Sequence, residues 1–154
     1  MALALERMIA PATGFPARHS SEETESKLDI SVVFTSVDAT LRALREAGNL
    51  ASNLGGRITL IVPQTVPYPL PLTSPPVPAD FNERRLRVIA NNCRIETRVY
   101  IYLCRDVLET LQSVLQPHSL VVIGSRKSWW PTAAKRLAAK LRHFGHQVVI
   151  TERE

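Results

Sequence analysis

The chain has 154 residues, of which 45% are hydrophobic and 21% are charged. This composition is typical of one soluble globular domain and excludes collagen-like, wholly disordered and polytopic membrane proteins. Nineteen Lys and Arg residues against fourteen Asp and Glu residues give a formal net charge of +5, which favours anionic partners but falls short of a dedicated nucleic-acid binder. No apolar run is long enough to span a membrane, and the charges of Glu6 and Arg7 stand where the apolar part of an export signal would lie. We therefore expect a cytoplasmic protein with neither nucleic acid nor a membrane among its partners.

The start of the chain differs in composition from the rest. From Pro11 to Lys27 it is rich in Pro, Ser, Thr and Glu and shows no period of 2 or 3.6 residues, which predicts a flexible tail. Regular patterns begin at residue 28. We therefore divide the chain into a tail (1–27), one α/β domain (28–151) and a charged end (152–154).

Strand and helix patterns alternate through the first half of the domain. The predicted strands are 30–34, 58–62 and 97–103, and the predicted helices are 36–54 and 80–93. Gly55 follows the first helix, as a left-handed C-cap does. Seven of the eleven prolines lie between residues 63 and 79, and they predict a semi-rigid loop because proline breaks helices and central strands.

The same alternation continues to the end of the domain. The predicted helices are 107–115 and 131–144, and the predicted strands are 120–123 and 148–151. Asp106 and Glu109, one turn apart, are expected to begin the third helix rather than to catalyse a reaction, and Pro131 is expected to open the fourth. Alternating strands and helices predict an open five-stranded parallel sheet with helices on both faces.

The residues most often used in catalysis or metal binding form no recognisable pattern. Cys93 and Cys104 match neither a redox nor a metal-ligand spacing, so we expect both thiols to be reduced. His118, His143 and His146 have no acid or cysteine at the spacing of a catalytic triad. We therefore expect no catalytic residue and no metal.

Sheets of this kind bind ligands beyond the carboxyl ends of their strands, where the strand order reverses. The loops that follow residues 34 and 123 are therefore the candidate site. The residues of these two loops that could bind an anion are Thr35, Ser36, Gly124, Ser125, Arg126 and Lys127. The alternative is a basic turn with no ligand.

Two tryptophans and a run of basic residues follow in the second loop. We expect Trp129 and Trp130 to pack across the loop against the helix start, as a hydrophobic staple does, and base stacking is the alternative. Between Arg126 and His143 there are six Lys or Arg residues and no Asp or Glu. Such a run is usually a helix face exposed to solvent. The alternative is that it binds an acidic protein or a small anion.

The order of these elements resembles the universal stress protein family over about residues 28–151. The matching segments are ISVVFTSVDATLRALREAGNLASNLGGRITLIVP near the start, and SLVVIGS and KLRHFGHQVVI near the end. The resemblance implies an adenine nucleotide alpha hydrolase-like fold with strand order 3-2-1-4-5. It also implies a homodimer that forms through the last strand, Val148 to Thr151.

The chain departs from the nucleotide-binding branch of that family. This branch carries an aspartate at the end of the first strand and a G-x-x-G-x9-G-[S/T] loop after the fourth. Here Thr35 stands at the aspartate position and Ser36 at the glycine after it, and Gly124 alone of the loop glycines remains, with Lys127 in place of the second. Such glycines let backbone amides approach a polyphosphate closely, so their loss predicts a degenerate nucleotide site.

We therefore expect a non-catalytic module of the stress response that has no cofactor, does not hold ATP tightly and acts through a protein or small-anion partner. The alternative is a protein that binds ATP, AMP or another small anion with the loop Gly124–Lys127, with weak ATP hydrolysis.

Overall fold

The computed structural model describes residues 28–72, 74–77, 79–91, 95 and 97–152. The expected tail, Cys93 and the last two residues lie outside this part of the chain. Its strands are β1 (Asp29–Val33), β2 (Arg57–Thr65), β3 (Thr97–Cys104), β4 (Leu120–Ser125) and β5 (Gln147–Glu152). Its helices are α1 (Val37–Leu54), α2 (Ala79–Asn91), α3 (Val107–Val114) and α4 (Ala133–His143).

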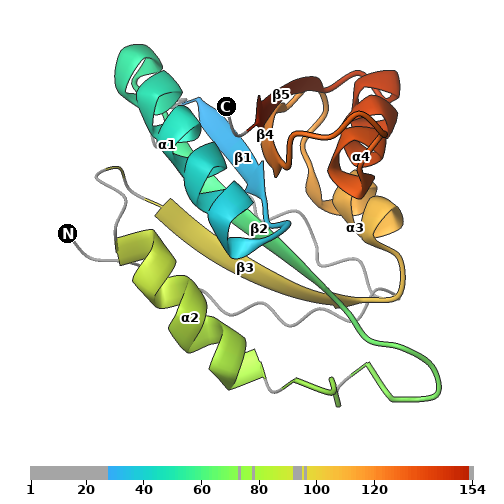
Figure 1. Cartoon of the computed structure of the whole chain (residues 1–154). Helices are drawn as coiled ribbons and strands as arrows, with labels where there is room; N and C mark the ends of the chain where they lie inside the picture. The colour runs from blue at the N-terminus through green and yellow to red at the C-terminus, as the bar shows by residue number, and fades with distance from the viewer. Residues whose placement is uncertain (1–27, 73, 78, 92–94, 96, 153–154) are drawn as a thin grey trace.

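The strands form one sheet in the order β3-β2-β1-β4-β5, and every neighbouring pair is parallel. The fold class and strand order are therefore confirmed (Figure 1). The order reverses between β1 and β4, because β2 lies on one side of β1 and β4 on the other. This reversal places the loop after β1 beside the loop after β4.

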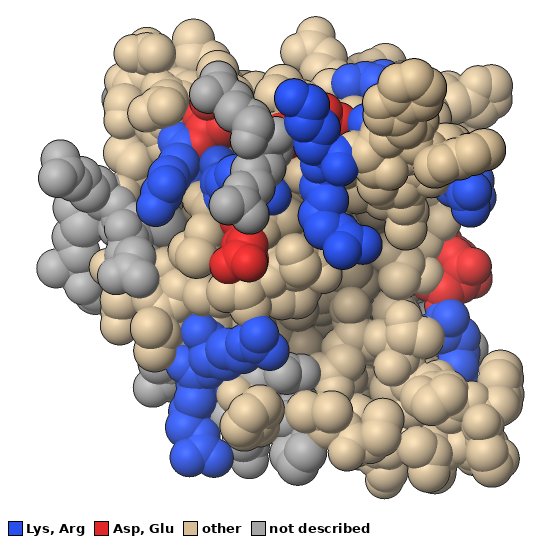
Figure 2. All heavy atoms as spheres, in the orientation of Figure 1, with Lys and Arg blue, Asp and Glu red and all other residues tan. Residues whose placement is uncertain are grey.

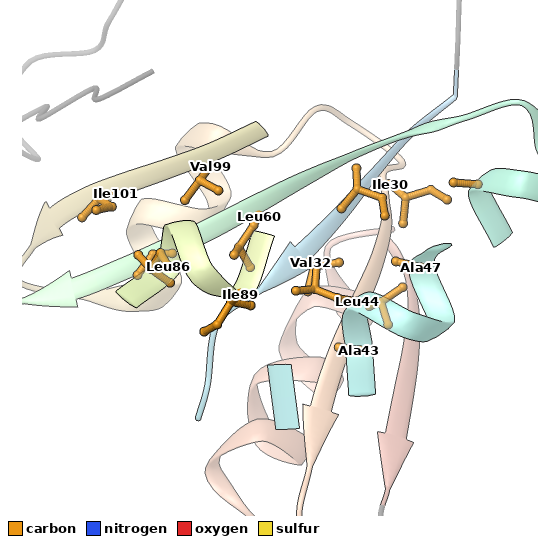
Figure 3. Close-up of a cluster of buried hydrophobic side chains, with 14 residues drawn as sticks. Ile30, Val32, Ala43, Leu44, Ala47, Leu60, Leu86, Ile89, Val99 and Ile101 are labelled. Carbon is orange, nitrogen blue, oxygen red and sulfur yellow. The ribbon is translucent and has the colours of Figure 1, made fainter. Parts of the chain in front are cut away.

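Two hydrophobic clusters hold the helices against opposite faces of the sheet. On one face, α1 and α2 cover side chains of β1, β2 and β3, such as Ile30 and Leu60 (Figure 3). On the other face, α3 and α4 cover Val33, Ile123 and their neighbours. Ile30 and Val32 of β1 belong to the first cluster and Val33 to the second, so both faces of this central strand are buried.

The predicted helix ends are confirmed at two sites. Gly55 has φ +68° and its N–H donates to the carbonyl of Ala51, so it ends α1 in the left-handed conformation. Asp106 accepts a hydrogen bond from the N–H of Glu109, 2.8 Å away, and so caps α3.

Three expected element boundaries were wrong. β2 continues through Pro63 to Thr65, because β1 has ended at the pair Val33 and Ile61 and leaves no partner there for the missing proline N–H. β4 continues past Gly124 to Ser125, where β5 still pairs with it. The fourth helix begins at Ala133 rather than Pro131, since Thr132 is its N-cap.

Among the described helices, none combines the length and the apolar character needed to cross a bilayer.

Candidate functional site

The carboxyl ends of β1 and β4 are joined by hydrogen bonds from Thr35. Its Oγ1 donates to the carbonyl oxygen of Gly124 over 2.9 Å, and its N–H donates to Oγ1 of Thr40 over 3.2 Å. The structure thus brings together the two loops that the sequence selected. The same contacts engage both donors of Thr35 within the chain.

At Gly124 the first turn of α1 lies directly against β4. A Cβ at this position would lie 2.0 Å from the carbonyl oxygen of Ala39 and 2.4 Å from its carbonyl carbon. Real Cβ atoms do not come this close to backbone, so only glycine fits beneath the first turn of α1. The space beside Gly124 is therefore filled by the helix.

The end of β4 is tied to the beginning of α4 by two hydroxyl groups. The Oγ of Ser125, which is 2% exposed, lies 2.9 Å from Oγ1 of Thr132. Thr132 in turn accepts a hydrogen bond from the N–H of Lys135 over 3.2 Å. The hydroxyl of Ser125, a predicted ligand group, is thus part of a helix cap.

The sequence did not single out Arg42 and Thr151, which also lie at this edge. The Nη2 of Arg42 donates to the carbonyl oxygen of Ser125 over 3.2 Å, whereas its Nε is buried without a partner. Thr151 pairs with Gly124 across the β4–β5 ladder, and its Oγ1 is likewise buried and unpartnered. No local motif marks an arginine in mid-helix or a threonine in an edge strand, so only the tertiary structure reveals them.

Ser128 makes two hydrogen bonds that join parts of the loop between β4 and α4 to each other and to α4. The Oγ of Ser128 accepts a hydrogen bond from the N–H of Trp130 over 3.2 Å, and its carbonyl accepts one from Nζ of Lys135 over 3.3 Å. The same Nζ lies 2.7 Å from Oε1 of Glu152 on β5. Arg126 and Lys127 are exposed, as are Thr35 and Ser36 among the predicted site residues, whereas Gly124 and Ser125 are buried.

The expectation that the tryptophans pack across this loop was wrong. Trp129 exposes 103% of its reference surface and Trp130 exposes 82%. The start of α4 needs no apolar staple, because Thr132 caps it and the side chain of Lys135 bridges the loop and β5. The two indoles are left in solvent.

The basic side chains do not merge into one patch on the face drawn in Figure 2. Lys and Arg side chains form several separate groups there, and acidic side chains lie beside some of them.

At the end of β3, burial raises the pKa of the Cys104 thiol, so this free cysteine stays protonated. Within the described part of the chain, no three His, Cys, Asp or Glu side chains gather into a metal-binding group.

No protein-family model matches the chain, and no curated protein matches it. Solved structures do. One from the universal stress protein family of Burkholderia pseudomallei is 17% identical, with a TM-score of 0.56 over 84% of this chain and 98% of that one. Universal stress protein UspA of Lactobacillus plantarum is 16% identical, with a TM-score of 0.56 over 80% of this chain and 96% of that one.

A third similar structure is a universal stress protein solved in complex with cAMP. It is 16% identical, with a TM-score of 0.52 over 83% of this chain and 98% of that one. At these identities the three likenesses show a shared fold. The chain therefore has the universal stress protein fold over almost the whole length of each of these proteins.

Proposed function

We propose that the protein is a non-catalytic module of the universal stress protein type, which regulates or protects through a protein or small-anion partner and does not hold ATP tightly. The observation that carries this proposal is that the polar groups of the candidate site, at the carboxyl ends of β1 and β4, are hydrogen-bonded within the chain. Thr35 uses its N–H and O–H within the chain, and the hydroxyl of Ser125 lies against Thr132. Donors that already have partners must give them up to bind a phosphate, which costs free energy.

The residues at this edge fit an adenine nucleotide poorly. A polyphosphate cradle needs backbone amides that the ligand can approach closely. Gly124 offers no such approach on its α1 side, because the backbone of Ala39 fills that space. The exposed side chains of Arg126 and Lys127 remain available to an anion, and long solvated side chains suit a weakly held or protein-borne charge better than a buried polyphosphate.

A second candidate function is the binding of a small anion, including a nucleotide such as ATP or AMP, by the loop Gly124–Lys127 with Thr35 and Ser36. The unpartnered Nε of Arg42 and Oγ1 of Thr151 favour it, since both belong to residues that adjoin the end of β4. Buried polar atoms usually have a partner. An anion or a water molecule would satisfy these two.

These candidates differ in what the protein retains from the cell. The proposed function predicts that protein purified from cells and then heat-denatured releases no adenine nucleotide detectable by chromatography. Stoichiometric release of ATP, AMP or cAMP would favour the second candidate. Titration of inorganic phosphate and AMP into Arg126→Ala/Lys127→Ala, with Arg45→Ala/Arg85→Ala on other helices as the matched control, would then locate the anion.

We further propose that the protein is cytoplasmic and forms a homodimer through the free edge of β5. The N–H of Gln147 donates to the carbonyl of Ser119, so this residue and every second one after it face β4. Val148 and Ile150 consequently turn their backbone groups outward. Arg142 already donates to the carbonyl of Val148 over 2.8 Å, and the remaining outward groups are open to a second strand.

A further inference from the structure

Two exposed indoles stand on a loop that is hydrogen-bonded within itself and to Lys135 of α4. Trp129 and Trp130 are 103% and 82% exposed, and they are the two tryptophans of the chain. The contacts of Ser128 with Trp130 N–H and Lys135 Nζ hold the loop beneath them. Exposing two adjacent large aromatic side chains to water is costly, and contiguous exposed apolar patches are found at interaction sites.

The charged residues that neighbour the indoles in the sequence are basic, and one acidic residue, Glu152 of β5, pairs with Lys135 beside the same loop. Arg126 and Lys127 precede them and are exposed. On α4, the exposed residues Arg136, Lys140 and His143 recur at i, i+4 and i+7, which places them along one stripe. The stripe ends at Phe144, which is 49% exposed and whose ring meets that of His143 edge-on at 5.8 Å between centroids. No acidic residue occurs between positions 126 and 143.

We propose that the Trp129–Trp130 loop and this basic stripe of α4 dock on the surface of an anionic lipid bilayer. Indole rings favour the boundary between headgroups and acyl chains, because they combine a large apolar body with one polar N–H. Lys and Arg side chains next to them attract anionic headgroups. Stable attachment to a bilayer takes two such signals, an apolar one and a basic one, and both occur within residues 126–144.

Docking on the surface of a bilayer differs from spanning it, which is the membrane role that the sequence excludes. The expectation of no membrane partner rested on the lack of a spanning run, and a loop that enters only the interface needs none. A bilayer also requires no concave surface on the protein. Single-stranded nucleic acid is held instead in a basic groove lined by stacking side chains, whereas these indoles project from a loop at 103% and 82% exposure.

Intrinsic fluorescence gives a direct test, because both tryptophans of the chain lie in this loop. The full chain is titrated with vesicles of phosphatidylcholine and phosphatidylglycerol in equal amounts, and with vesicles of phosphatidylcholine alone. We expect a blue shift of the emission with the mixed vesicles and a much smaller one with the neutral vesicles. No shift with the mixed vesicles, or equal shifts with both, would overturn the proposal.

Two other polyanions identify a different partner class. A single-stranded oligonucleotide and polyglutamate are titrated at the same concentration of charge as the mixed vesicles. We expect neither to shift the emission as far as the vesicles do. A shift as large or larger with the oligonucleotide would assign the loop to nucleic acid, and one with polyglutamate would assign it to an acidic protein, and either result overturns the proposal.

Variants test the contribution of each signal by co-sedimentation with the mixed vesicles. Trp129→Ser/Trp130→Ser should lower the partition coefficient at least tenfold, since each indole removed from the interface loses its apolar transfer energy. Arg126→Gln/Lys127→Gln should lower it about 5- to 30-fold. Because all four side chains are exposed, circular dichroism should show an unchanged fold.

Matched controls carry the same chemical changes elsewhere. Phe81→Ser removes an aromatic side chain that is 57% exposed on α2, and Arg45→Gln/Arg85→Gln removes two exposed charges from α1 and α2, which cover the opposite face of the sheet from α4. We expect both controls to sediment within about twofold of the unaltered protein. Equal losses in the controls, or full binding by the tryptophan variant, would contradict a localised docking surface.

Discussion

Gly124 determines how closely α1, β1 and β4 pack together at the candidate site. Its missing side chain lets the first turn of α1 lie directly on β4, with the carbonyl of Ala39 where a Cβ would be. Its carbonyl oxygen also accepts the hydrogen bond from Thr35. One glycine therefore fixes the spacing of α1, β1 and β4 at the switch in strand order.

Substitution of Gly124 by alanine should destabilise the protein by about 1–3 kcal/mol or more, because the new methyl group would press on backbone that cannot move aside. Gly48→Ala is the matched control. Gly48 lies within α1 and nothing stands within 4 Å of its added Cβ, so that variant should gain about 0.5–1 kcal/mol from its helix propensity. Urea denaturation measures both changes, and equal stabilities of the two variants would contradict this role.

At the residue scale, the sequence located the edge but not its internal bonding. Strand patterns and the rule for parallel sheets placed Thr35 and Gly124 at neighbouring strand ends, and the structure joins them. The bond from Arg42 to Ser125 spans 83 positions, and it depends on the packing of α1 on β4. Such contacts have no local signal, because they arise only once the sheet has formed.

The N-termini of α1 and α3 are capped in different ways. Asp106 accepts a hydrogen bond from Glu109 N–H, 2.8 Å away. Ser36 occupies the N-cap position of α1, but its side chain makes no capping hydrogen bond. Two residues of the preferred capping types thus contribute unequally.

Replacement of Asp106 by alanine should cost about 0.5–2 kcal/mol of unfolding free energy, since an N–H of the first turn of α3 would lose its acceptor. Ser36→Ala should cost less than about 0.5 kcal/mol, because no such bond is lost. Thermal unfolding followed by circular dichroism compares the two variants. A larger effect at Ser36 would show that capping does not explain how these helices begin.

The connection between α4 and β5 should make the stability depend on pH. Burial lowers the pKa of His146 below its usual 6.5, and the nearby His118 lowers it further. Ser119 N–H donates to its Nδ1 over 3.2 Å, which requires that nitrogen to be unprotonated. The folded state therefore holds His146 neutral, so its contribution is full above pH 6.5 and declines as the pH falls below that value.

Urea denaturation at about pH 7.5 and about pH 5.5 measures this decline. In His146→Asn the side-chain oxygen can still accept from Ser119 but does not titrate, so the loss of stability between the two pH values should be smaller. An equal loss in the variant would mean that other groups cause the pH dependence.

At the element scale, three of the predictions that failed involve proline and tryptophan. Pro63 is compatible with β2 because its position lies beyond the end of β1, and the length of a neighbouring strand cannot be known from one segment. Pro131 indicated a helix start, but Thr132, the residue after it, is the cap. The tryptophans are exposed because Lys135 reaches across the loop instead, a contact between side chains that hydrophobic patterns do not predict.

At the scale of the whole molecule, the free edge of β5 predicts a homodimer. Light scattering at micromolar concentration should give twice the monomer mass. Ile150→Pro should give a folded monomer, because the N–H of Ile150 points away from β4 and would be needed only for pairing with the strand of a second copy. Val149→Pro is the contrasting variant, since its N–H faces β4 and its loss should destabilise the sheet itself. A monomeric unaltered protein would contradict the dimer.

Calorimetric titration with ATP, with and without magnesium, tests the central claim most directly. The internally bonded hydroxyls of Thr35 and Ser125, and the filled space beside Gly124, predict no binding in the micromolar range. Micromolar binding that Arg126→Ala/Lys127→Ala weakens about ten- to a hundredfold would contradict the claim, because it would show that this edge still binds the nucleotide.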